Sequence, residues 1–253
     1  MEHWGFKMIE LKQGNCLELM KDIPSHSIDM ILCDLPYGTT SCKWDIIIPF
    51  EPLWEEYKRI IKNNGAIALF GKQPFTSFLI QSNLKWWRYE LIWEKEKGTD
   101  FGNANRKPLN AHESIQLFYN KQPTYNKQMR TGEPYTINRK KNTNNNNDLN
   151  FKSNTQGLYV NKGERTPISV LKFSRDNITK GKSLHPTQKP VQLLEWLIKT
   201  YTNENELVLD NCMGSGSTGI ACINTNRNFI GYELDENYFA IAQNRINKHL
   251  TNS

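Results

Sequence analysis

Two short polar motifs each follow an apolar run, and this pairing limits the folds that the chain can adopt. The run Ile28-Asp29-Met30-Ile31-Leu32-Cys33 leads into Asp34-Leu35-Pro36-Tyr37, and Leu207-Val208-Leu209 leads into Asp210-Asn211-Cys212-Met213-Gly214-Ser215-Gly216. A short apolar run that ends in turn residues is typical of a buried strand. In an open α/β sheet, binding sites form beyond the carboxyl ends of the strands. We therefore expect both motifs to lie at one crevice, although they come from opposite halves of the chain.

The second motif suits a small ligand that must approach the backbone closely. Gly214 and Gly216 have no side chain to block that approach, and both tolerate positive φ. With Gly219 they match the pattern G-x-G-x-x-G, and the next strand ends at Glu233, which is placed to accept hydrogen bonds from a ribose. The motif predicts an adenosine-bearing cofactor without selecting one, so a nicotinamide oxidoreductase stays open. A tight strand-to-helix turn without a ligand is the simpler alternative.

The first motif combines a carboxylate, a backbone carbonyl before a proline, and an aromatic ring. A planar base could stack on Tyr37 while its amino group donates to the Asp34 carboxylate and the Leu35 carbonyl. Such a nitrogen is a poor nucleophile, because its lone pair is delocalised into the ring. Two fixed acceptors favour a nitrogen whose lone pair can attack, which stabilises the transition state. The alternative is an ordinary turn that contains Pro36.

Together, the two motifs resemble those of the amino-methylating DNA methyltransferases that use S-adenosylmethionine. Their order matches the beta group, in which an Asp-Pro-Pro-Tyr motif precedes the target-recognition region and the glycine motif. Asn15-Cys16-Leu17 resembles the family segment beside the cofactor adenine, and His185-Pro186-Thr187-Gln188-Lys189-Pro190 resembles the motif before its cofactor half. The resemblance covers residues 8–120 and 184–250. It departs from the family at Leu35, at Asn15 and at Asn211-Cys212, which stand where the family usually has Pro, Asp and Pro-Phe.

The resemblance implies an α/β fold: a doubly wound, Rossmann-like methyltransferase sheet with an antiparallel edge hairpin and an inserted target-recognition region. It assigns residues 1–120 to the catalytic half of the core, 121–183 to the insert, and 184–253 to the cofactor-binding half. The catalytic residues that it implies are Asp34, Leu35, Pro36 and Tyr37. The residues that it implies for S-adenosylmethionine are Asn15, Cys16, Asp34, Thr187, Lys189, Asp210, Cys212, Gly214, Gly216 and Glu233.

The implied reaction is methyl transfer to the exocyclic N6 of an adenine flipped out of double-stranded DNA. The family's adenine enzymes favour Asp at the first motif position and its cytosine enzymes often have Ser, so Asp34 favours adenine. N4-cytosine methylation uses the same chemistry and stays an alternative. RNA or protein-glutamine methylation is disfavoured by the motif order, and a non-catalytic DNA-binding module by the intact Asp34, Pro36 and Tyr37.

Positive charge is concentrated in the predicted insert. Residues 121–182 contain 13 Lys and Arg but 4 Asp and Glu, whereas the whole chain carries a net charge of +6. Such a basic segment is typical of a surface that binds a polyanion, although a merely solvated surface is the simpler interpretation. We expect Arg130, Arg139, Lys140 and Lys141 to contact DNA.

Other sequence features exclude several classes of protein. The five cysteines form no C-x-x-C pair, which indicates reduced thiols. His112-Glu113 lacks the second histidine of a zincin, so we expect no metal site. The N-terminus has no signal-peptide pattern and no apolar run approaches 18 residues, so we expect a cytoplasmic protein of a prokaryotic cell or a phage, with no membrane partner. The sequence leaves open a homodimer and a cognate restriction endonuclease.

Apolar periodicity predicts the remaining elements. Strands are expected at residues 9–11, 28–34, 66–70, 86–94, 114–119, 207–210 and 228–233, and those at 86–94 and 114–119 would form the antiparallel hairpin. Helices are expected at 17–22, 50–61, 75–82 and 190–201, after the glycine motif through Cys222, and beyond Asp235, which is a natural N-cap.

Overall fold

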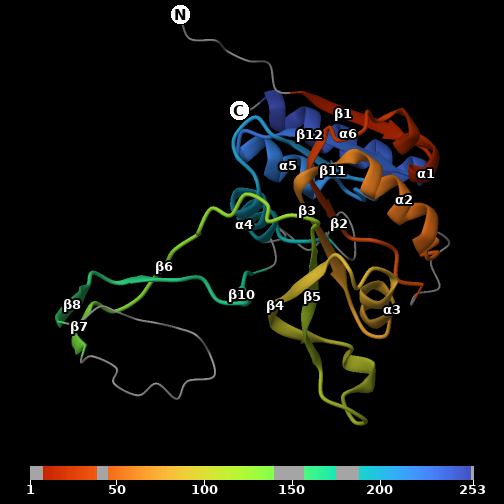
Figure 1. Ribbon diagram of the computed structural model, residues 1–253. Coiled ribbons are helices and arrows are strands. Elements are labelled where there is room, and N and C mark those ends of the chain that lie inside the picture. The colour runs from red at the N-terminus through yellow and green to blue at the C-terminus, as the bar shows by residue number, and fades with distance from the viewer. Residues whose placement is uncertain (1–7, 39–44, 140–156, 175–187, 252–253) are drawn as a thin grey trace, which may run out of the picture. The chain divides into compact units, whose positions relative to one another are not determined.

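The computed structural model describes residues 8–38, 45–139, 157–174 and 188–251 (Figure 1). Contacts divide the chain into two compact units, of which the smaller is Lys127–Ile168. This unit lies within the predicted insert, residues 121–183, but is shorter than it. The described residues that flank it, 121–126 and 169–174, belong to the larger unit.

An eight-stranded sheet forms the centre of the larger unit, in the order β1-β12-β11-β2-β3-β5-β4-β10. The strands, in that order, are Ile9–Gln13, Asn228–Glu233, Leu207–Asp210, Ile28–Cys33, Ile61–Gly71, Asn110–Phe118, Trp87–Thr99 and Val170–Lys172. The five strands from β1 to β3 run parallel, whereas β5 is antiparallel to both β3 and β4. The predicted β4–β5 hairpin is therefore present. A three-residue strand, β10, adds in parallel outside it.

Helices cover both faces of this sheet, as the prediction of a doubly wound fold requires (Figure 1). One face carries α1 (Cys16–Leu19), η1 (Met20–Asp22), α2 (Phe50–Ile60) and α3 (Phe75–Ser82), and the other carries α4 (Val191–Tyr201), α5 (Ser217–Asn224) and α6 (Glu236–Thr251). A further short 3-10 helix, η2, spans Phe101–Asn103. The central strand β2 shows why both faces are apolar: Met30 and Leu32 pack on the side of α4, while Ile31 and Cys33 pack on the side of α2. Successive side chains of a strand point to opposite faces, so a strand buried on both sides reads as a continuous apolar run.

The helix starts follow from local chemistry. The Asp235 carboxylate accepts the amide hydrogens of Asn237 and Tyr238 at 2.9 and 3.0 Å, which makes it the predicted N-cap of α6. Pro190 immediately precedes α4, where its fixed φ suits the start of a helix. These contacts orient the two helices that follow the segments resembling family motifs.

Strand β3 begins earlier than periodicity indicates. It starts at Ile61, directly after α2, whereas residues 66–70 alone were expected to be extended. Gly65 therefore lies inside the strand rather than beyond a helix end. A side chain there would meet the backbone oxygen of Asp29 at 2.8 Å. The close approach of β2 explains this glycine.

The smaller unit contains two antiparallel strand pairs. Strands β6 (Arg130–Thr131) and β9 (Glu164–Arg165) form one, and β7 (Tyr135–Arg139) and β8 (Gly157–Asn161) form the other. The Arg165 guanidinium lies 4.7 Å from the centre of the Tyr135 ring, a cation–π contact between them.

Among the described residues, none of the helices has the length and apolar composition that crossing a bilayer needs.

Candidate active site

The two sequence motifs lie at the ends of neighbouring parallel strands. Leu209 of β11 pairs with Ile31 of β2, so Asp34 directly after β2 and Asp210 at the end of β11 meet at one edge of the sheet. The two motifs therefore lie at the same edge of the sheet, as the sequence predicts. Their separation in the chain is bridged by the sheet order, in which the last third of the chain pairs with the first.

Both carboxylate oxygens of Asp34 accept hydrogen bonds from the protein. The Tyr37 hydroxyl donates to Oδ1 at 2.5 Å, and the Lys189 ammonium donates to Oδ2. Burial and the nearby negative charge of Asp34 raise the pKa of Tyr37 well above its usual value, so its hydroxyl keeps the proton that it donates. Asp34 is therefore held by two donors that come from different parts of the chain.

The rest of the first motif is fixed by packing. The Leu35 side chain is buried in the core beside α2 and α3, which anchors the loop at the position where the family usually has a proline. Pro36 is half-buried, and the Tyr37 ring lies 5.0 Å from the Phe75 ring at an interplanar angle of 34°. The aromatic residue expected to stack on a base thus already has one aromatic neighbour.

Lys189 lies between two carboxylates. Besides Asp34, its ammonium contacts Oε2 of Glu113 on β5 at 3.2 Å, and Lys95 of β4 contacts the other oxygen of Glu113 at 2.5 Å. Burial disfavours the charge of Lys189, but Asp34 and Glu113 outweigh burial and raise its pKa. Burial likewise disfavours the charge of Glu113, yet Lys189 and Lys95 lower its pKa to about 2. Lys189 and Glu113 are therefore charged at neutral pH, and with Asp34 and Lys95 they form one largely buried network.

Sequence reasoning missed Glu113 and Lys95 as site residues. Glu113 was considered only as part of a metal motif, and Lys95 not at all. The available signal was their place in predicted strands, because charged side chains in a buried sheet are almost always paired. That signal indicates that each of the two side chains needs an oppositely charged partner, but it does not identify the partner residue.

The glycine turn after β11 is held by two carboxylates. Asp210 accepts the Thr218 hydroxyl at 2.6 Å and the Cys212 amide at 3.2 Å, and Glu233 accepts the Gly214 amide at 2.8 Å. Burial raises the pKa of Asp210 to about 7 and also raises that of Glu233. The second Glu233 oxygen accepts the amide of Asp235 at 2.9 Å, so this acid braces the turn as well as lying at the expected ribose position.

The two glycines of the turn differ in their surroundings. Both have positive φ, +52° at Gly214 and +77° at Gly216. A side-chain carbon at Gly214 would meet nothing within 4 Å, whereas at Gly216 it would lie 3.0 Å from Ile246 and 3.1 Å from Ala242 of α6. Open space for a ligand therefore lies beside Gly214, and Gly216 lets α6 approach.

The Asn15–Cys16 segment packs against the same turn. Asn15 caps α1 by accepting the Leu17 amide at 2.9 Å. The Cys16 thiol hydrogen-bonds the Cys212 thiol, and Cys212 in turn contacts Cys33. The hydrogen bond to Cys212 and burial raise the pKa of Cys16, and burial raises that of Cys33 to about 12, so these thiols stay protonated. Cys16 and the Asn15 cap therefore lie beside the glycine turn, and a role of Asn15, Cys16 and Cys212 in cofactor binding stays a prediction.

Two of the four predicted DNA-contacting residues, Arg130 and Arg139, are described, and both belong to the smaller unit. Arg130, on β6, donates to the Thr166 carbonyl at 3.2 Å, and Arg139 ends β7. Lys140 and Lys141 lie outside the described residues, as does Thr187 of the predicted cofactor set. DNA contact through these four basic residues stays a prediction.

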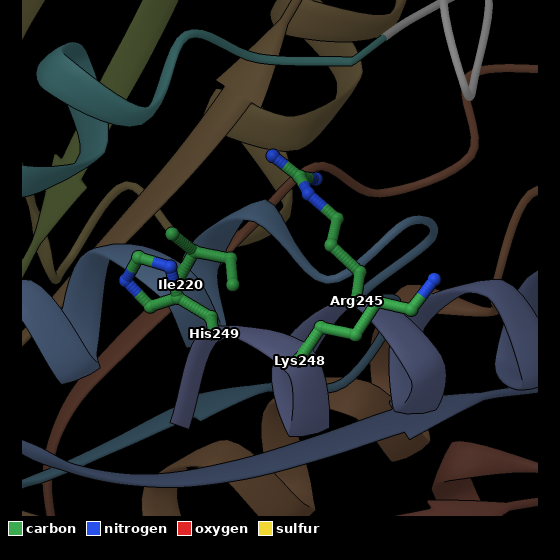
Figure 2. Close-up of a pocket in the computed structure, with 4 residues that line it drawn as sticks. All are labelled: Ile220, Arg245, Lys248 and His249. Carbon is green, nitrogen blue, oxygen red and sulfur yellow. The ribbon is translucent and has the colours of Figure 1, made fainter. Parts of the chain in front are cut away.

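A pocket with basic lining residues lies between α5 and α6, apart from the Asp34 and Lys189 contacts at the ends of β2 and β11. Figure 2 shows its lining residues, Ile220 on α5 and Arg245, Lys248 and His249 on α6. Arg245 donates to the Ser215 carbonyl at 3.1 Å and to the Ser217 hydroxyl at 2.9 Å. Arg245 thus braces the glycine turn from the α6 side. In the described part of the chain, no group of three or more His, Cys, Asp or Glu is placed to hold a metal ion.

Comparison with known proteins gives the same assignment as the geometry. A family described as DNA methylase, of the N6/N4 type, matches residues 28–244. The chain belongs to the N6/N4 DNA methylase family. It is 30% identical to the Type II methyltransferase M.HinfI of Haemophilus influenzae over 264 residues, covering 92% of this chain and 67% of that protein. It is 27% identical to the Type II methyltransferase M.HpaI of Haemophilus parainfluenzae, covering 92% and 72%.

Solved structures of DNA methylases share the fold. The M1.HpyAVI–SAM complex superposes with a TM-score of 0.62 at 25% identity, covering 94% of this chain and 100% of that one. The cytosine-N4-specific PvuII DNA methyltransferase superposes with a TM-score of 0.65 at 14% identity, covering 96% and 92%. The expected methyltransferase sheet and the resemblance to amino DNA methyltransferases are therefore confirmed. This DNA methylase acts on an amino group of DNA.

Proposed function

We propose that this DNA methylase transfers a methyl group from S-adenosylmethionine to N6 of a flipped-out adenine in double-stranded DNA. The observation that carries the proposal is the Asp34 carboxylate, held by Tyr37 and Lys189 beside the glycine turn of β11. Asp34, rather than Ser, at the first motif position favours adenine. N4-cytosine is the second candidate, because the same acceptors suit its amino group.

The turn after β11 fits the methyl donor, which is the family's cofactor. Open space beside Gly214 admits a ligand close to the backbone, and Glu233 lies at the next strand end, where it can accept from a ribose. Asn15, Cys16 and Cys212 border the same turn, and Asp34, Thr187, Lys189 and Asp210 belong to the proposed set. Gly216 supports the turn by letting α6 approach it. S-adenosylmethionine supplies an electrophilic methyl group.

The chain's own residues prepare the nucleophile. Asp34 and the Leu35 carbonyl accept the two amino hydrogens, which orients the nitrogen and favours its lone pair. Tyr37 offers its ring to the base and fixes Asp34 through its hydroxyl. After transfer the nitrogen is cationic and acidic, so no strong general base is needed. A base inside a duplex is out of reach, so the adenine must leave the stack.

The smaller unit supplies the proposed DNA contacts. Residues 121–183 would act as the target-recognition insert, with Arg130, Arg139, Lys140 and Lys141 on phosphates. A cognate restriction endonuclease is a proposal of the same kind, suggested by the Type II relatives. A homodimer is left open by the sequence and stays a proposal.

The test is the identity of the modified base in living cells. DNA from a methylation-deficient host that expresses the protein is sequenced with modified-base detection, beside DNA from the same host with the empty vector. N6-methyladenine at one short sequence supports the proposal and gives the recognition site. N4-methylcytosine at such a site would replace it with the second candidate.

A further inference from the structure

Glu113 of β5 is linked to the proposed catalytic carboxylate, Asp34, through one intermediate side chain. It does not contact Asp34 itself; the two carboxylates are joined by the Lys189 ammonium, which donates to Asp34 and lies 3.2 Å from Glu113. The Lys189 side chain is 8% exposed and that of Glu113 is 14% exposed, so water screens their charges weakly. The charge of Glu113 therefore affects the electrostatic energy of Lys189 and, through it, of Asp34.

Among the described residues, ion pairs join Asp34, Lys189, Glu113 and Lys95 into one series of alternating charge. Asp34 and Glu113 are negative, whereas Lys189 and Lys95 are positive, and each contact in the series joins opposite charges. The nitrogen that accepts a methyl group becomes positive in the transition state. A cluster with one unbalanced cation beside it would raise the energy of that state. Glu113 supplies the negative charge that prevents this imbalance.

The position of Lys189 also depends on both carboxylates. Its ammonium lies 5.0 Å from the centre of the Phe70 ring, so one side of the group faces an aromatic wall. With Glu113 neutral, Asp34 would be the one carboxylate among the described residues that still attracts the ammonium, and the pair would tighten. A tighter pair neutralises Asp34, the group that must attract the amino hydrogens of the base.

We propose that Glu113 is a positioning residue for methyl transfer, which shares the Lys189 ammonium with Asp34 and so keeps Asp34 charged and available to the target amine. This inference rests on the proposed role of Asp34 in amine activation. It goes beyond that role by assigning a function to a strand residue that does not touch substrate.

The test compares Glu113→Gln with the wild type in methyl transfer to unmethylated phage DNA. The amide keeps the shape of the side chain and removes its charge. We expect kcat to fall on the order of tenfold to a hundredfold. The Kd for S-adenosylmethionine should stay within about twofold, since Glu113 lies on β5 rather than at the glycine turn. Rates are divided by the number of cofactor-binding sites measured by calorimetry, which removes any misfolded fraction.

The pH profile separates positioning from a merely structural role. Two carboxylates raise the pKa of Lys189, and burial lowers it. Without the charge of Glu113 the pKa of Lys189 must fall, so in Glu113→Gln the ammonium that neutralises Asp34 loses its proton at a lower pH, and kcat should recover toward the wild-type value as the pH rises. A Lys189→Arg change added to Glu113→Gln should remove this alkaline recovery, because a guanidinium stays charged and keeps Asp34 neutralised.

Two further variants complete the design. Glu10→Gln is the matched control: Glu10 pairs with Lys12 at 2.8 Å on β1, at the opposite edge of the sheet, and its loss should leave kcat and the pH profile unchanged. Glu113→Asp keeps the charge on a shorter side chain and should give a kcat between those of the wild type and Glu113→Gln. If Glu113→Gln does not fold, Glu113→Asp decides the matter, and a wild-type kcat overturns the inference.

The outcomes distinguish this inference from the proposed function. The base that the wild type methylates reports the proposed function, whereas the ratio of variant to wild-type rates reports the role of Glu113 whichever base is modified. A reduced kcat at neutral pH that recovers as the pH rises supports the inference. A Glu113→Gln enzyme with wild-type kcat, or with reduced kcat but an unchanged pH profile, overturns it.

Discussion

Gly214 and Gly216 allow a paired test of the turn that follows β11, because they share positive φ but differ in their neighbours. An alanine at either position must adopt the left-handed region, which costs about 1–2 kcal/mol. At Gly216 the new carbon would also lie 3.0 Å from Ile246 and 3.1 Å from Ala242, and overpacking of this kind costs about 1–3 kcal/mol more. The expected loss in the free energy of unfolding is therefore roughly 2–5 kcal/mol for Gly216→Ala but only about 1–2 kcal/mol for Gly214→Ala.

Cofactor affinity should follow the opposite order. The space beside Gly214 is open, so a methyl group there enters the volume assigned to the ligand, and we expect the Kd for S-adenosylmethionine to rise about tenfold, or about 1.4 kcal/mol. Gly216→Ala faces α6, so its folded fraction should bind with a Kd within about threefold of the wild type, a change under about 1 kcal/mol.

Guanidinium unfolding measures the stability of each variant, and calorimetry at low temperature measures cofactor affinity. The wild type and a Gly102→Ala variant serve as references, since a side chain at Gly102 would meet nothing within 4 Å and its φ is not positive. Equal destabilisation by the two turn variants, or a larger loss of affinity in Gly216→Ala, would refute the assignment of the two glycines.

Three further predictions address the catalytic carboxylate, the acid of the turn and the basic segment. Asp34→Ala should lower the rate of methyl transfer by about 10²–10³, the cost of losing one preorganised group at a reacting centre, while cofactor affinity in calorimetry changes far less. The pKa of Asp210 rises from 3.8 to about 7 on folding, so the native state holds its proton more tightly, and stability should decline as pH rises from about 4 to 7, by up to about 4 kcal/mol. Asp210→Asn should flatten that decline in urea unfolding across this pH range, and an unchanged slope would show that another group titrates. Neutralising Arg139, Lys140 and Lys141 together should reduce the slope of log affinity for duplex DNA against log salt by up to about 0.9 per charge, and an unchanged slope in a fluorescence titration would mean that these charges only face solvent.

Elements with sharp boundaries could be predicted from the sequence. Strands β11 and β12 and helix α3 have the expected bounds, because apolar runs there stop at Asp, Glu or Pro residues. Strand β10 escaped notice, since a three-residue strand has no period to detect. Its pairing with β4 depends on tertiary contacts that no local pattern contains.

The parts of the site that consist of neighbouring residues in the sequence could be predicted. The parts that depend on contacts between distant segments could not. The strand-end motifs and the N-cap Asp235 follow from neighbouring residues alone. The link from Lys189 to Glu113 joins two distant segments, and only the antiparallel placement of β5 beside β3 brings them together. The contact between Gly216 and α6 likewise depends on how a helix packs, so the sequence indicated a special glycine without showing what required it.

The central claim is that Asp34 activates an adenine amino group for methylation. Purified protein and its Asp34→Ala variant are incubated with duplex DNA and S-adenosylmethionine carrying a labelled methyl group, and the DNA is digested to nucleosides that are separated by chromatography. The account predicts label in N6-methyl-2′-deoxyadenosine from the wild type and almost none from the variant, at equal cofactor occupancy. Label in N4-methyl-2′-deoxycytidine, or undiminished labelling by Asp34→Ala, would contradict it.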